Sequence, residues 1–301
     1  MRFDLNPFSI FDEIHIPYKR CVSSAEFSSI RAGGIIDACV YPRNISELIY
    51  IVEALQKSGT RYVLLGNCTN TLFSDSGFSG VAVILRLLSG FSAERGGVDV
   101  LCGTTLAYAI RKLSSSGIEL SSALSGIPGT LGAMVRGNCG CFGECISDIF
   151  ISCLVYDTKS NRTFNLTRDE MAFEYRTSTV AKENLIVLKA RLRTNVRSQS
   201  EIENSIFEYA RKRRESQPVE PSLGSFFKRP SSHSLTASQL IDQSGLKGYS
   251  VGGAEVSTKH AGFIVNKGCA TATEIITLAE HVKDRVFDKF SVLLEEEAVI
   301  I

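Results

Sequence analysis

Two glycine-rich segments constrain what this chain can fold into more than any other feature. Gly66–Thr71 follows the apolar run Tyr62–Leu65 directly, and the second segment extends from Gly126 to Gly143. Glycine lets backbone N–H groups line a concavity and lets a ligand approach the chain closely. Neither segment continues into Gly-Lys-Ser/Thr, and neither is a Gly-x-Gly-x-x-Gly turn between a strand and a helix. By spacing alone both are tight turns, and the alternative is a pair of loops that clamps one extended phosphate ligand.

Composition indicates an ordinary globular protein without a dominant charge. Of the 301 residues, 44% are hydrophobic and 22% are charged, which excludes disordered, collagen-like and coiled-coil chains. The 33 basic and 32 acidic residues give a net charge of +1, so no global field directs the protein to nucleic acid or an anionic membrane. No run approaches the roughly 20 apolar residues of a membrane helix, and Met1–Pro7 lacks the apolar core of a signal peptide. We therefore predict a cytoplasmic protein with no nucleic-acid or membrane partner.

The nine cysteines do not form the pattern of a disulfide framework, because their number is odd and they are scattered. Three of them cluster at Cys139, Cys141 and Cys145. Zinc sites use Cys-x-x-Cys pairs or nearby histidines, whereas no histidine lies between His15 and His233. We interpret the cluster as small packing residues in a glycine-rich turn and predict no metal site.

The order of apolar patterns predicts an α+β fold in three sections, 1–90, 91–200 and 201–301. Two helices begin with capping boxes, at Asn44–Glu47 and at Thr271–Glu274. The expected helices are 45–55, 106–113, 201–214, 238–243 and 272–287, and the expected strands are 62–65, 81–85, 98–101, 151–156, 185–192 and 263–265.

Three further residues are candidates for a functional role, although each also has a plain structural interpretation. Arg176 follows a tyrosine, so it is either a surface residue packed on the ring or a carboxylate clamp. Ser225 stands between Gly224 and two phenylalanines without a Gly-x-Ser-x-Gly elbow, which makes a hydrolase triad a poor explanation. Glu297 belongs to a run of three glutamates that otherwise reads as the solvated start of a strand.

Taken in order, these segments resemble the UDP-N-acetylenolpyruvoylglucosamine reductases, flavoenzymes of peptidoglycan precursor synthesis. The resemblance extends from about residue 27 to residue 301, and its longest motif is its most specific one. The motifs are Ile30–Gly34, the loop after Leu65, Gly126–Thr130, Asn138–Gly143, Tyr175–Ser178, Gly224–Phe227, Leu240–Asp242, Gly245–Gly248 and Val256–Asn266.

The resemblance implies a two-part FAD-binding region of the vanillyl-alcohol-oxidase type, 1–90 and 91–200, followed by an α+β substrate domain, 201–301. The FAD is expected to be non-covalent, because the chain has no histidine from 16 to 232 to which a flavin would be linked. The residues implied in FAD binding are Gly66, Asn67, Cys68, Thr69, Asn70, Thr71, Pro128, Gly129, Thr130, Gly132, Ala133, Asn138, Gly140 and Cys141.

The same resemblance implies the reaction. NADPH reduces the flavin and leaves, and the enolpyruvyl ether of UDP-N-acetylglucosamine then receives hydride at its terminal methylene. Arg176 matches the arginine that stabilises the negative charge beside the substrate carboxylate, Ser225 the serine that donates the proton, and Glu297 the catalytic glutamate. The residues implied in substrate binding are Tyr175, Lys228, Arg229 and His260.

The chain also departs from the family pattern. Cys68 stands where glycine is common, Arg229 where asparagine is common and Val299 where arginine is common. The catalytic glutamate is assigned to Glu297 within Glu295–Glu297 by its distance to Ile300–Ile301. The interval between Arg176 and Ser225 is too short for an additional substrate-covering loop, which indicates the shorter subclass.

Two alternatives remain open at the level of sequence. A flavin oxidase of the same superfamily, acting on another small acid or sugar, shares the glycine-rich loops without requiring Ser225 and Glu297 beside Arg176. A sugar-nucleotide binding module that has lost its flavin is the third interpretation. In each case we expect a monomer whose partner is a small molecule.

Overall fold

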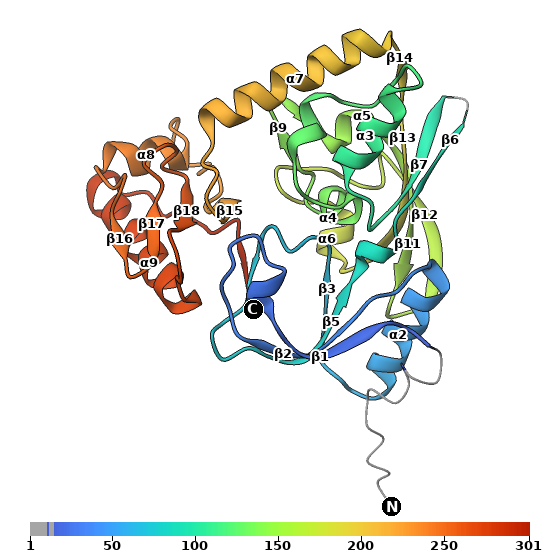
Figure 1. Cartoon of the computed structure of the whole chain (residues 1–301), viewed down its shortest axis with the longest axis horizontal. Coiled ribbons are helices and arrows are strands. Elements are labelled where there is room, and N and C mark those ends of the chain that lie inside the picture. Colours follow the sequence, from blue (N-terminus) through green and yellow to red (C-terminus); the bar gives the residue numbers. More distant parts are fainter. Residues whose placement is uncertain (1–10, 12–14, 95) are drawn as a thin grey trace, which may run out of the picture. The chain divides into compact units, whose positions relative to one another are not determined.

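The computed structural model describes residue 11, residues 15–94 and residues 96–301, and it divides into two compact units (Figure 1). Unit 1 comprises the described residues of Met1–Lys19, together with Cys39–Asn67 and Gly80–Lys212. Unit 2 comprises Arg20–Ala38, Cys68–Ser79 and Arg213–Ile301. The chain passes between the units several times, and the division into 1–90, 91–200 and 201–301 stays a prediction.

The secondary structure agrees with the sequence patterns, because every expected helix and strand is present with its ends within three residues of the expected ones. Four elements run from one unit into the other: β1 (Tyr18–Ser23), β2 (Ile35–Val40), β5 (Phe78–Ile84) and α7 (Gln199–Ser216).

Unit 1 contains the start of the first glycine-rich loop, the whole of the second glycine-rich segment and most of the short helices. Its helices are α2 (Ile45–Lys57), η2 (Leu85–Leu87), α3 (Leu106–Ser114), η3 (Ala123–Gly126), α4 (Leu131–Arg136), α5 (Ile146–Ile149) and α6 (Thr179–Lys182). Its strands are β3 (Tyr62–Leu65), β6 (Phe91–Glu94), β7 (Gly97–Leu101), β8 (Ile118–Glu119), β9 (Gly140–Cys141), β10 (Glu144–Cys145), β11 (Phe150–Asp157), β12 (Arg162–Thr167), β13 (Ile186–Leu192) and β14 (Asn195–Val196).

Unit 2 contains short strands, one 3-10 helix and two α-helices that lie wholly within it. Its elements are η1 (Ser24–Glu26), β4 (Thr71–Leu72), β15 (Ser222–Ser225), α8 (Ala237–Gln243), β16 (Ser250–Val251), β17 (Ala254–Val256), β18 (Phe263–Asn266), α9 (Ala272–Phe290) and β19 (Val299–Ile300).

The five-stranded sheet of unit 1 has the order β12-β11-β13-β7-β6, and every neighbouring pair is antiparallel. Along β13, Leu188, Ala190 and Leu192 are buried and alternate with the half-buried Lys189 and Arg191. This period of two gives the sheet one apolar face, and α4 packs on β13. The sheet therefore fixes α4, which begins at the end of the Gly126–Thr130 motif.

Strands β3 and β5 pair in parallel, from Tyr62 opposite Val81 to Leu65 opposite Ile84. The carboxyl ends of parallel strands lie at the same edge of a sheet, so the segments that follow them are neighbours. Gly66 and Asn67 follow β3, and the turn η2 follows β5. Gly103, after β7, joins them because its N–H donates to the carbonyl of Leu88 at 3.0 Å.

The core of unit 2 lies between the sheet β15-β18-β17-β16 and the helices α8 and α9. Helix α9 buries Ile275, Leu278, Val282 and Val286, which recur at helical spacing along one face. Strand β18 is buried along its whole length. Burial of these apolar faces holds β15, and with it Ser225, in a fixed register opposite Phe263.

Asp75 and Thr271 close the N-terminus of α9. The Thr271 hydroxyl accepts the Glu274 N–H at 3.1 Å, as the capping box predicts. Asp75 accepts the N–H groups of Ala272 and Thr273, both at 2.8 Å, and the Thr273 hydroxyl at 2.6 Å. Desolvation raises the pKa of Asp75, but the hydrogen bonds from Thr273 and Ala272 outweigh it and hold the pKa below 3.8. Asp75 thereby links the segment that follows β4 to the N-terminus of α9.

We predict that Asp75→Ala lowers the free energy of unfolding at pH 7 by about 1–2 kcal/mol, the usual contribution of a helix cap. Because the folded pKa is lowered, this contribution is present above pH 3.8 and is lost as the pH falls through the folded pKa. Urea unfolding followed by circular dichroism measures this loss of free energy at pH 7 and again at a pH below the folded pKa of Asp75. Asp284→Ala, an exposed acid on the same helix, is the control, and equal losses in the two variants at pH 7 would contradict the assigned role of Asp75.

Candidate active site

The start of the first glycine-rich loop packs against the second glycine-rich segment in unit 1. A Cβ on Gly66 would lie 2.2 Å from the Thr130 hydroxyl oxygen, so only glycine permits this approach. The side-chain amide of Asn67 donates to the carbonyl of Pro128 at 2.8 Å. The structure therefore brings Gly66 and Asn67 together with Pro128 and Thr130, as the two-loop interpretation of the sequence requires.

The second glycine-rich segment is fixed by the strand end that precedes α3. The N–H of Leu131 donates to the carbonyl of Thr104 at 2.8 Å, and that of Gly132 to the carbonyl of Cys102 at 2.9 Å. A Cβ on Gly132 would lie 3.0 Å from the Cβ of Cys102. Gly129 is buried in this segment, whereas Pro128 and Ala133 are exposed.

The Thr130 hydroxyl has the properties of a ligand-binding group. Thr130 is 1% exposed, and its oxygen has no hydrogen-bond partner among the described residues. A buried hydroxyl without a partner is unfavourable by about 1–3 kcal/mol and is rare in folded proteins. The oxygen is directed at Gly66, where no side chain fills the space. These residues fit a ligand that supplies a hydrogen-bonding group, such as a phosphate oxygen.

The remainder of the first loop belongs to unit 2 and pairs with β19. The Asn70 amide donates to the carbonyl of Glu297 at 2.8 Å, and the Val299 N–H donates to the carbonyl of Asn70 at 2.9 Å. Strand β4, which begins at Thr71, pairs in parallel with β19. Cys68 has a φ of +53°, a left-handed conformation in which glycine is less strained than cysteine. Glu297 is thereby brought to the loop that contains Cys68, Thr69, Asn70 and Thr71.

Asn138 connects the β9–β10 hairpin with the turn that carries Arg176. Its amide donates to the carbonyl of Glu174 at 3.0 Å, and its side-chain oxygen accepts the Ser147 N–H at 3.3 Å. In the hairpin, Gly140 lies opposite Cys145, and a Cβ on Gly140 would come within 2.6 Å of its sulfur. The thiol of Cys141 contacts the carbonyl of Ala123 at 3.0 Å.

Arg176 stands in a tight turn in which Glu174 and Thr177 form an antiparallel bridge. Its φ is +58°, and its guanidinium lies over the ring of Tyr175, 5.4 Å from the centroid. Burial raises the pKa of the Cys145 thiol and the Arg176 charge lowers it, so the guanidinium lies within electrostatic reach of the β9–β10 hairpin. Tyr175 itself is 56% exposed. Both sequence interpretations of Arg176, packing on an aromatic ring and binding an anion, are compatible with this geometry.

Ser225 and Glu297 lie on neighbouring segments of unit 2. Gly224, with a φ of +79°, turns the chain immediately before Ser225. The Glu297 N–H donates to the carbonyl of Phe226 at 2.8 Å. A residue next to Ser225 therefore binds the backbone of Glu297 directly.

The three successive glutamates have different environments. Glu295 is exposed and pairs with Lys228 at 3.2 Å. Glu296 pairs with Lys283 at 2.9 Å. Glu297 is half-buried, and its backbone joins both the first loop and the segment of Ser225. These contacts support the choice of Glu297 over its two neighbours.

Three residues expected to bind substrate lie in the same unit. Arg229 donates to the carbonyl of Ser234 at 3.4 Å, and Lys228 is held by Glu295. The ring of His260 accepts the Gly262 N–H at its Nδ1, 3.2 Å away. Burial lowers the pKa of His260 below 6.5. The lowered pKa favours the neutral imidazole, in which this hydrogen bond assigns the proton to Nε2.

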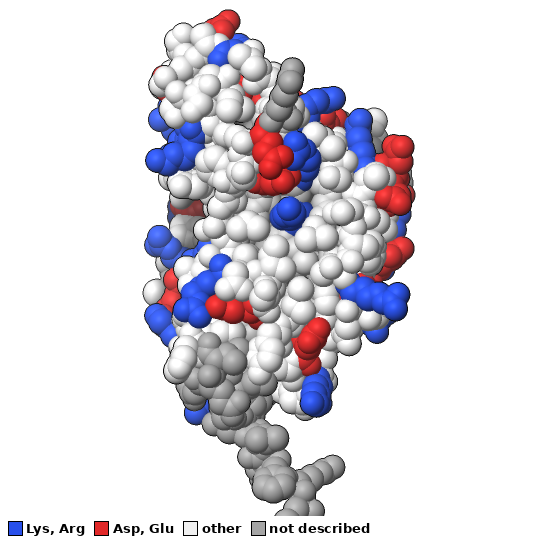
Figure 2. All heavy atoms as spheres, turned by 90° about the vertical axis from the view of Figure 1, so that its right-hand side faces the viewer, with Lys and Arg blue, Asp and Glu red and all other residues white. Residues whose placement is uncertain are grey.

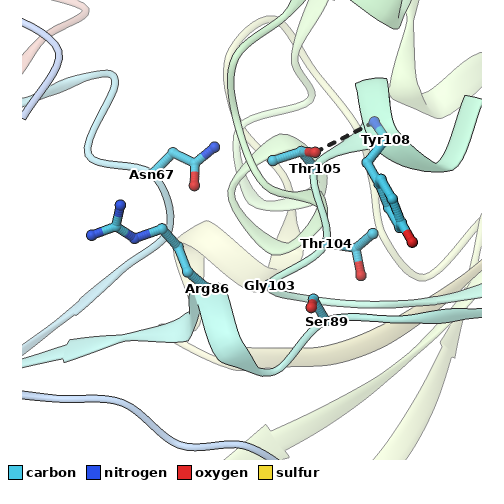
Figure 3. A pocket seen from close by; sticks show the side chains of 7 residues that line it. All are labelled: Asn67, Arg86, Ser89, Gly103, Thr104, Thr105 and Tyr108. Atoms are coloured by element: carbon cyan, nitrogen blue, oxygen red, sulfur yellow. Dashed lines mark hydrogen bonds between the residues drawn. The ribbon is translucent and has the colours of Figure 1, made fainter. Parts of the chain in front are cut away.

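Sequence reasoning missed a cavity of about 330 Å³ beside the first loop (Figure 3). The sequence signal for this cavity is Gly103, which follows β7, together with Thr105, the N-cap of α3. A glycine followed by a helix cap occurs at the ends of many strands, so this signal alone does not predict a cavity. The residues that line the cavity are Asn67, Arg86, Ser89, Gly103, Thr104, Thr105 and Tyr108.

Comparison with known proteins agrees with the family resemblance that the sequence motifs indicate. A family model described as FAD binding domain matches residues 36–161, and one described as UDP-N-acetylenolpyruvoylglucosamine reductase, C-terminal domain, matches residues 217–301. The UDP-N-acetylenolpyruvoylglucosamine reductase of Caldicellulosiruptor saccharolyticus is 37% identical over 289 residues, which cover 95% of this chain and 92% of that protein. The chain belongs to the UDP-N-acetylenolpyruvoylglucosamine reductase family.

Two further relatives of the family agree along nearly their full length. The reductase of Listeria innocua is 37% identical over 292 residues, covering 95% of this chain and 96% of the relative. The crystal structure of the reductase from Thermus caldophilus superimposes with a TM-score of 0.79 at 28% identity, covering 95% of this chain and 99% of that one. The predicted family and the FAD-binding α+β fold are confirmed. The roles of individual residues stay predictions.

On the face drawn in Figure 2, basic and acidic side chains are scattered among a majority of uncharged atoms, and neither charge dominates. Within the described residues, no group of three or more His, Cys, Asp and Glu side chains is placed to hold a metal ion. Across the same residues, no helix has the length and apolar character needed to cross a membrane.

We predict that Thr130→Val raises the dissociation constant for FAD about tenfold or more, because a hydrogen bond to a charged group contributes about 1.5–3 kcal/mol. The melting temperature should not fall, since the hydroxyl has no hydrogen-bond partner in the described part of the chain. Thr104→Val is the matched control. Its hydroxyl bonds the N–H and carbonyl of Gly90, both at 2.9 Å, so this variant should lose stability. If Thr130→Val instead loses stability with unchanged FAD affinity in fluorescence titration, the hydroxyl is structural.

Proposed function

We propose that Arg176, Ser225 and Glu297 carry out the reduction of UDP-N-acetylglucosamine enolpyruvate to UDP-N-acetylmuramate. Family membership gives the reaction, an FAD-dependent oxidoreduction of peptidoglycan precursor synthesis with NADPH as reductant. The observation that carries the residue assignment is the bond network of Glu297, whose backbone joins the first FAD loop through Asn70 and the segment of Ser225 through Phe226.

The glycine-rich loops would hold the cofactor. Asn67 and Thr130 present polar groups beside Gly66, and Asn70 and Thr71 continue the same loop. Bound FAD supplies the hydride that the terminal methylene of the enol ether receives. The chain's own residues then have to bind the substrate carboxylate, stabilise the charge that develops next to it and deliver one proton to carbon.

Arg176 is proposed to bind the substrate carboxylate. After hydride addition, the electron pair of the broken C=C π bond resides on the carbon that bears the carboxylate. A fixed cation beside that group stabilises the enolate-like charge, and it is most effective where water is excluded. The tight turn from Glu174 to Thr177 and the underlying ring of Tyr175 hold the guanidinium in place before substrate arrives.

Ser225 is proposed to donate the proton. Its O–H bond breaks as the new C–H bond forms at the carbon next to the carboxylate, and water then returns a proton to the serine oxygen. A serine hydroxyl is a weak acid, but the carbanion is a strong base, so position governs the rate. Glu297, half-buried beside this segment, is proposed to assist the same proton transfer.

The substrate nucleotide is proposed to lie against Tyr175, Lys228, Arg229 and His260. Arg229 gives this chain a guanidinium at a position where asparagine is common in the family, so its contact with the diphosphate is ionic. His260 can donate from Nε2, because its Nδ1 accepts the Gly262 N–H. We further propose that the enzyme works as a monomer in the cytoplasm. No feature of the site favours the flavin oxidase over the reductase.

We predict that Ser225→Ala separates the two half-reactions. NADPH should still reduce the flavin at close to the wild-type rate, because that step needs no proton donor to carbon. Reoxidation by the enolpyruvyl substrate should fall by at least about 100-fold, the usual contribution of general acid catalysis. Anaerobic stopped-flow absorbance near 450 nm follows both steps, with Ser222→Ala on the same strand as control. Equal losses in both half-reactions would exclude a proton-donor role.

Substitution of Glu297 and of Glu295 tests which of these two glutamates is the catalytic acid. We expect Glu297→Gln to slow reoxidation by the enolpyruvyl substrate at least about tenfold and to leave reduction by NADPH intact. Glu295→Gln removes an exposed ion pair with Lys228 and should change either rate by less than about twofold. The same stopped-flow measurement applies. A greater loss of reoxidation in Glu295→Gln than in Glu297→Gln would move the role to Glu295.

A further inference from the structure

The turn that carries Arg176 has a strained backbone. Arg176 has a φ of +58°, in the left-handed region. This conformation costs an ordinary residue about 1–2 kcal/mol, so it persists only where neighbouring contacts hold it. Inside the turn, the backbone bonds between Glu174 and Thr177 measure 3.2 and 3.4 Å, at or beyond the long end of the usual range. The contacts that hold Arg176 therefore come partly from outside the turn.

The first outside contact comes from the end of helix α4, which closes in a Schellman motif. The Cys139 N–H donates to the carbonyl of Met134 at 2.9 Å, and the Asn138 N–H donates to that of Val135 at 3.3 Å. Asn138 takes the left-handed position of the motif, with a φ of +41°. Glycine is usual at this position and would close the helix equally well. Asparagine adds an amide, and this amide donates to the carbonyl of Glu174 at 3.0 Å.

The other end of the same side chain fixes its orientation. Asn138 is 9% exposed, and its side-chain oxygen accepts the Ser147 N–H at 3.3 Å. Because the oxygen faces Ser147, the amide nitrogen faces the turn of Arg176. The sequence motif implied a role for Asn138 in FAD binding, and these two bonds indicate a second role for it.

The second outside contact comes from Ser178, which is fully buried. Its hydroxyl donates to the carbonyl of Arg136, in the last turn of α4, at 2.8 Å. A serine directly before a helix usually caps it, but no N–H group among the described residues of α6 is capped by this side chain. Arg136 in turn donates to the carbonyl of Val180 at 3.1 Å. Helices α4 and α6 lie side by side (Figure 1), so the end of α4 holds the segment of Arg176 from both sides.

We propose that Asn138 and Ser178 are positioning residues for the reduction, because they hold the guanidinium of Arg176 where it stabilises the charge beside the substrate carboxylate. The inference rests on the proposed role of Arg176. Neither residue has to touch the substrate, since each acts through a bond between α4 and the segment that contains the turn. Helix α4 is six residues long and begins after Thr130, so it also fixes the turn relative to the glycine-rich segment. A misplacement of about 1 Å can slow a reaction about 100-fold.

The test follows both half-reactions of the FAD-loaded enzyme by anaerobic stopped-flow absorbance in Asn138→Asp and Ser178→Ala. Aspartate tolerates the left-handed backbone and still accepts the Ser147 N–H, but it cannot donate to Glu174. Ser178→Ala removes the other bond without adding a charge. We expect each variant to slow reoxidation by the enolpyruvyl substrate at least about tenfold. Reduction by NADPH and the dissociation constant for FAD should stay within about twofold of wild type.

Two matched controls lie elsewhere in unit 1. Asn165→Asp makes the same chemical change at an exposed position of β12. Ser114 is 3% exposed and donates to the carbonyl of Arg111 at 2.8 Å, the distance found between Ser178 and Arg136. Ser114→Ala should therefore lower the melting temperature about as much as Ser178→Ala. Neither control should slow reoxidation more than about twofold.

A double-mutant cycle with Arg176→Ala separates positioning from a general structural role. If Asn138 and Ser178 act through the guanidinium, adding either substitution to Arg176→Ala slows reoxidation less than about twofold further. A further loss as large as that in the single variants would overturn the inference, as would wild-type reoxidation in both single variants. A tenfold weaker affinity for FAD in both would show that the two residues act on the cofactor instead. Wild-type reoxidation in Arg176→Ala would overturn the proposed role of Arg176, and the inference with it.

Discussion

The close approach of Gly66 to Thr130 is the constraint on which the cofactor side of the structure depends. A single methyl group on Gly66 would fill the space in front of the Thr130 hydroxyl. Because that hydroxyl is buried without a partner among the residues that the structure describes, unit 1 retains an unsatisfied group that a ligand can satisfy. Folded proteins tolerate such a group mainly where function requires it, and here it lies where two glycine-rich segments meet.

The residues proposed to act on the substrate are held in place by strand register, backbone hydrogen bonds and an aromatic contact. Ser225 is fixed by strand register, since β15 pairs with β18, a strand of the same sheet that is buried along its whole length. Glu297 is fixed through its backbone, which is hydrogen-bonded to Asn70 and to Phe226. Arg176 is fixed in unit 1 by a turn and an aromatic ring. Rigid elements thus hold each reacting group, so little ordering is left for the moment of binding.

The sequence predicted the elements well because local signals determine them. The N-cap Asn44, the capping box at Thr271 and the apolar repeats that follow them determine where α2 and α9 begin. The motifs also predicted Gly66, Thr130 and Ser225 as site residues, although not the orphaned hydroxyl. Arg86 and Tyr108 escaped prediction because their proximity to Asn67 follows from the parallel pairing of β3 and β5 and from the packing of Gly103, which no local pattern encodes. The different partners of Glu295, Glu296 and Glu297 likewise depend on tertiary contacts.

The pairing of β4 with β19 has a consequence for how the protein is made. The Asn70 side chain and the Glu297 carbonyl that it binds are 227 residues apart in the chain. At the usual pace of about 5–20 residues per second on the ribosome, Glu297 is added roughly 10–50 s after Asn70. During that interval the first loop has been synthesised without the strand that completes it, so a nascent chain must keep this edge of β4 from pairing with other strands.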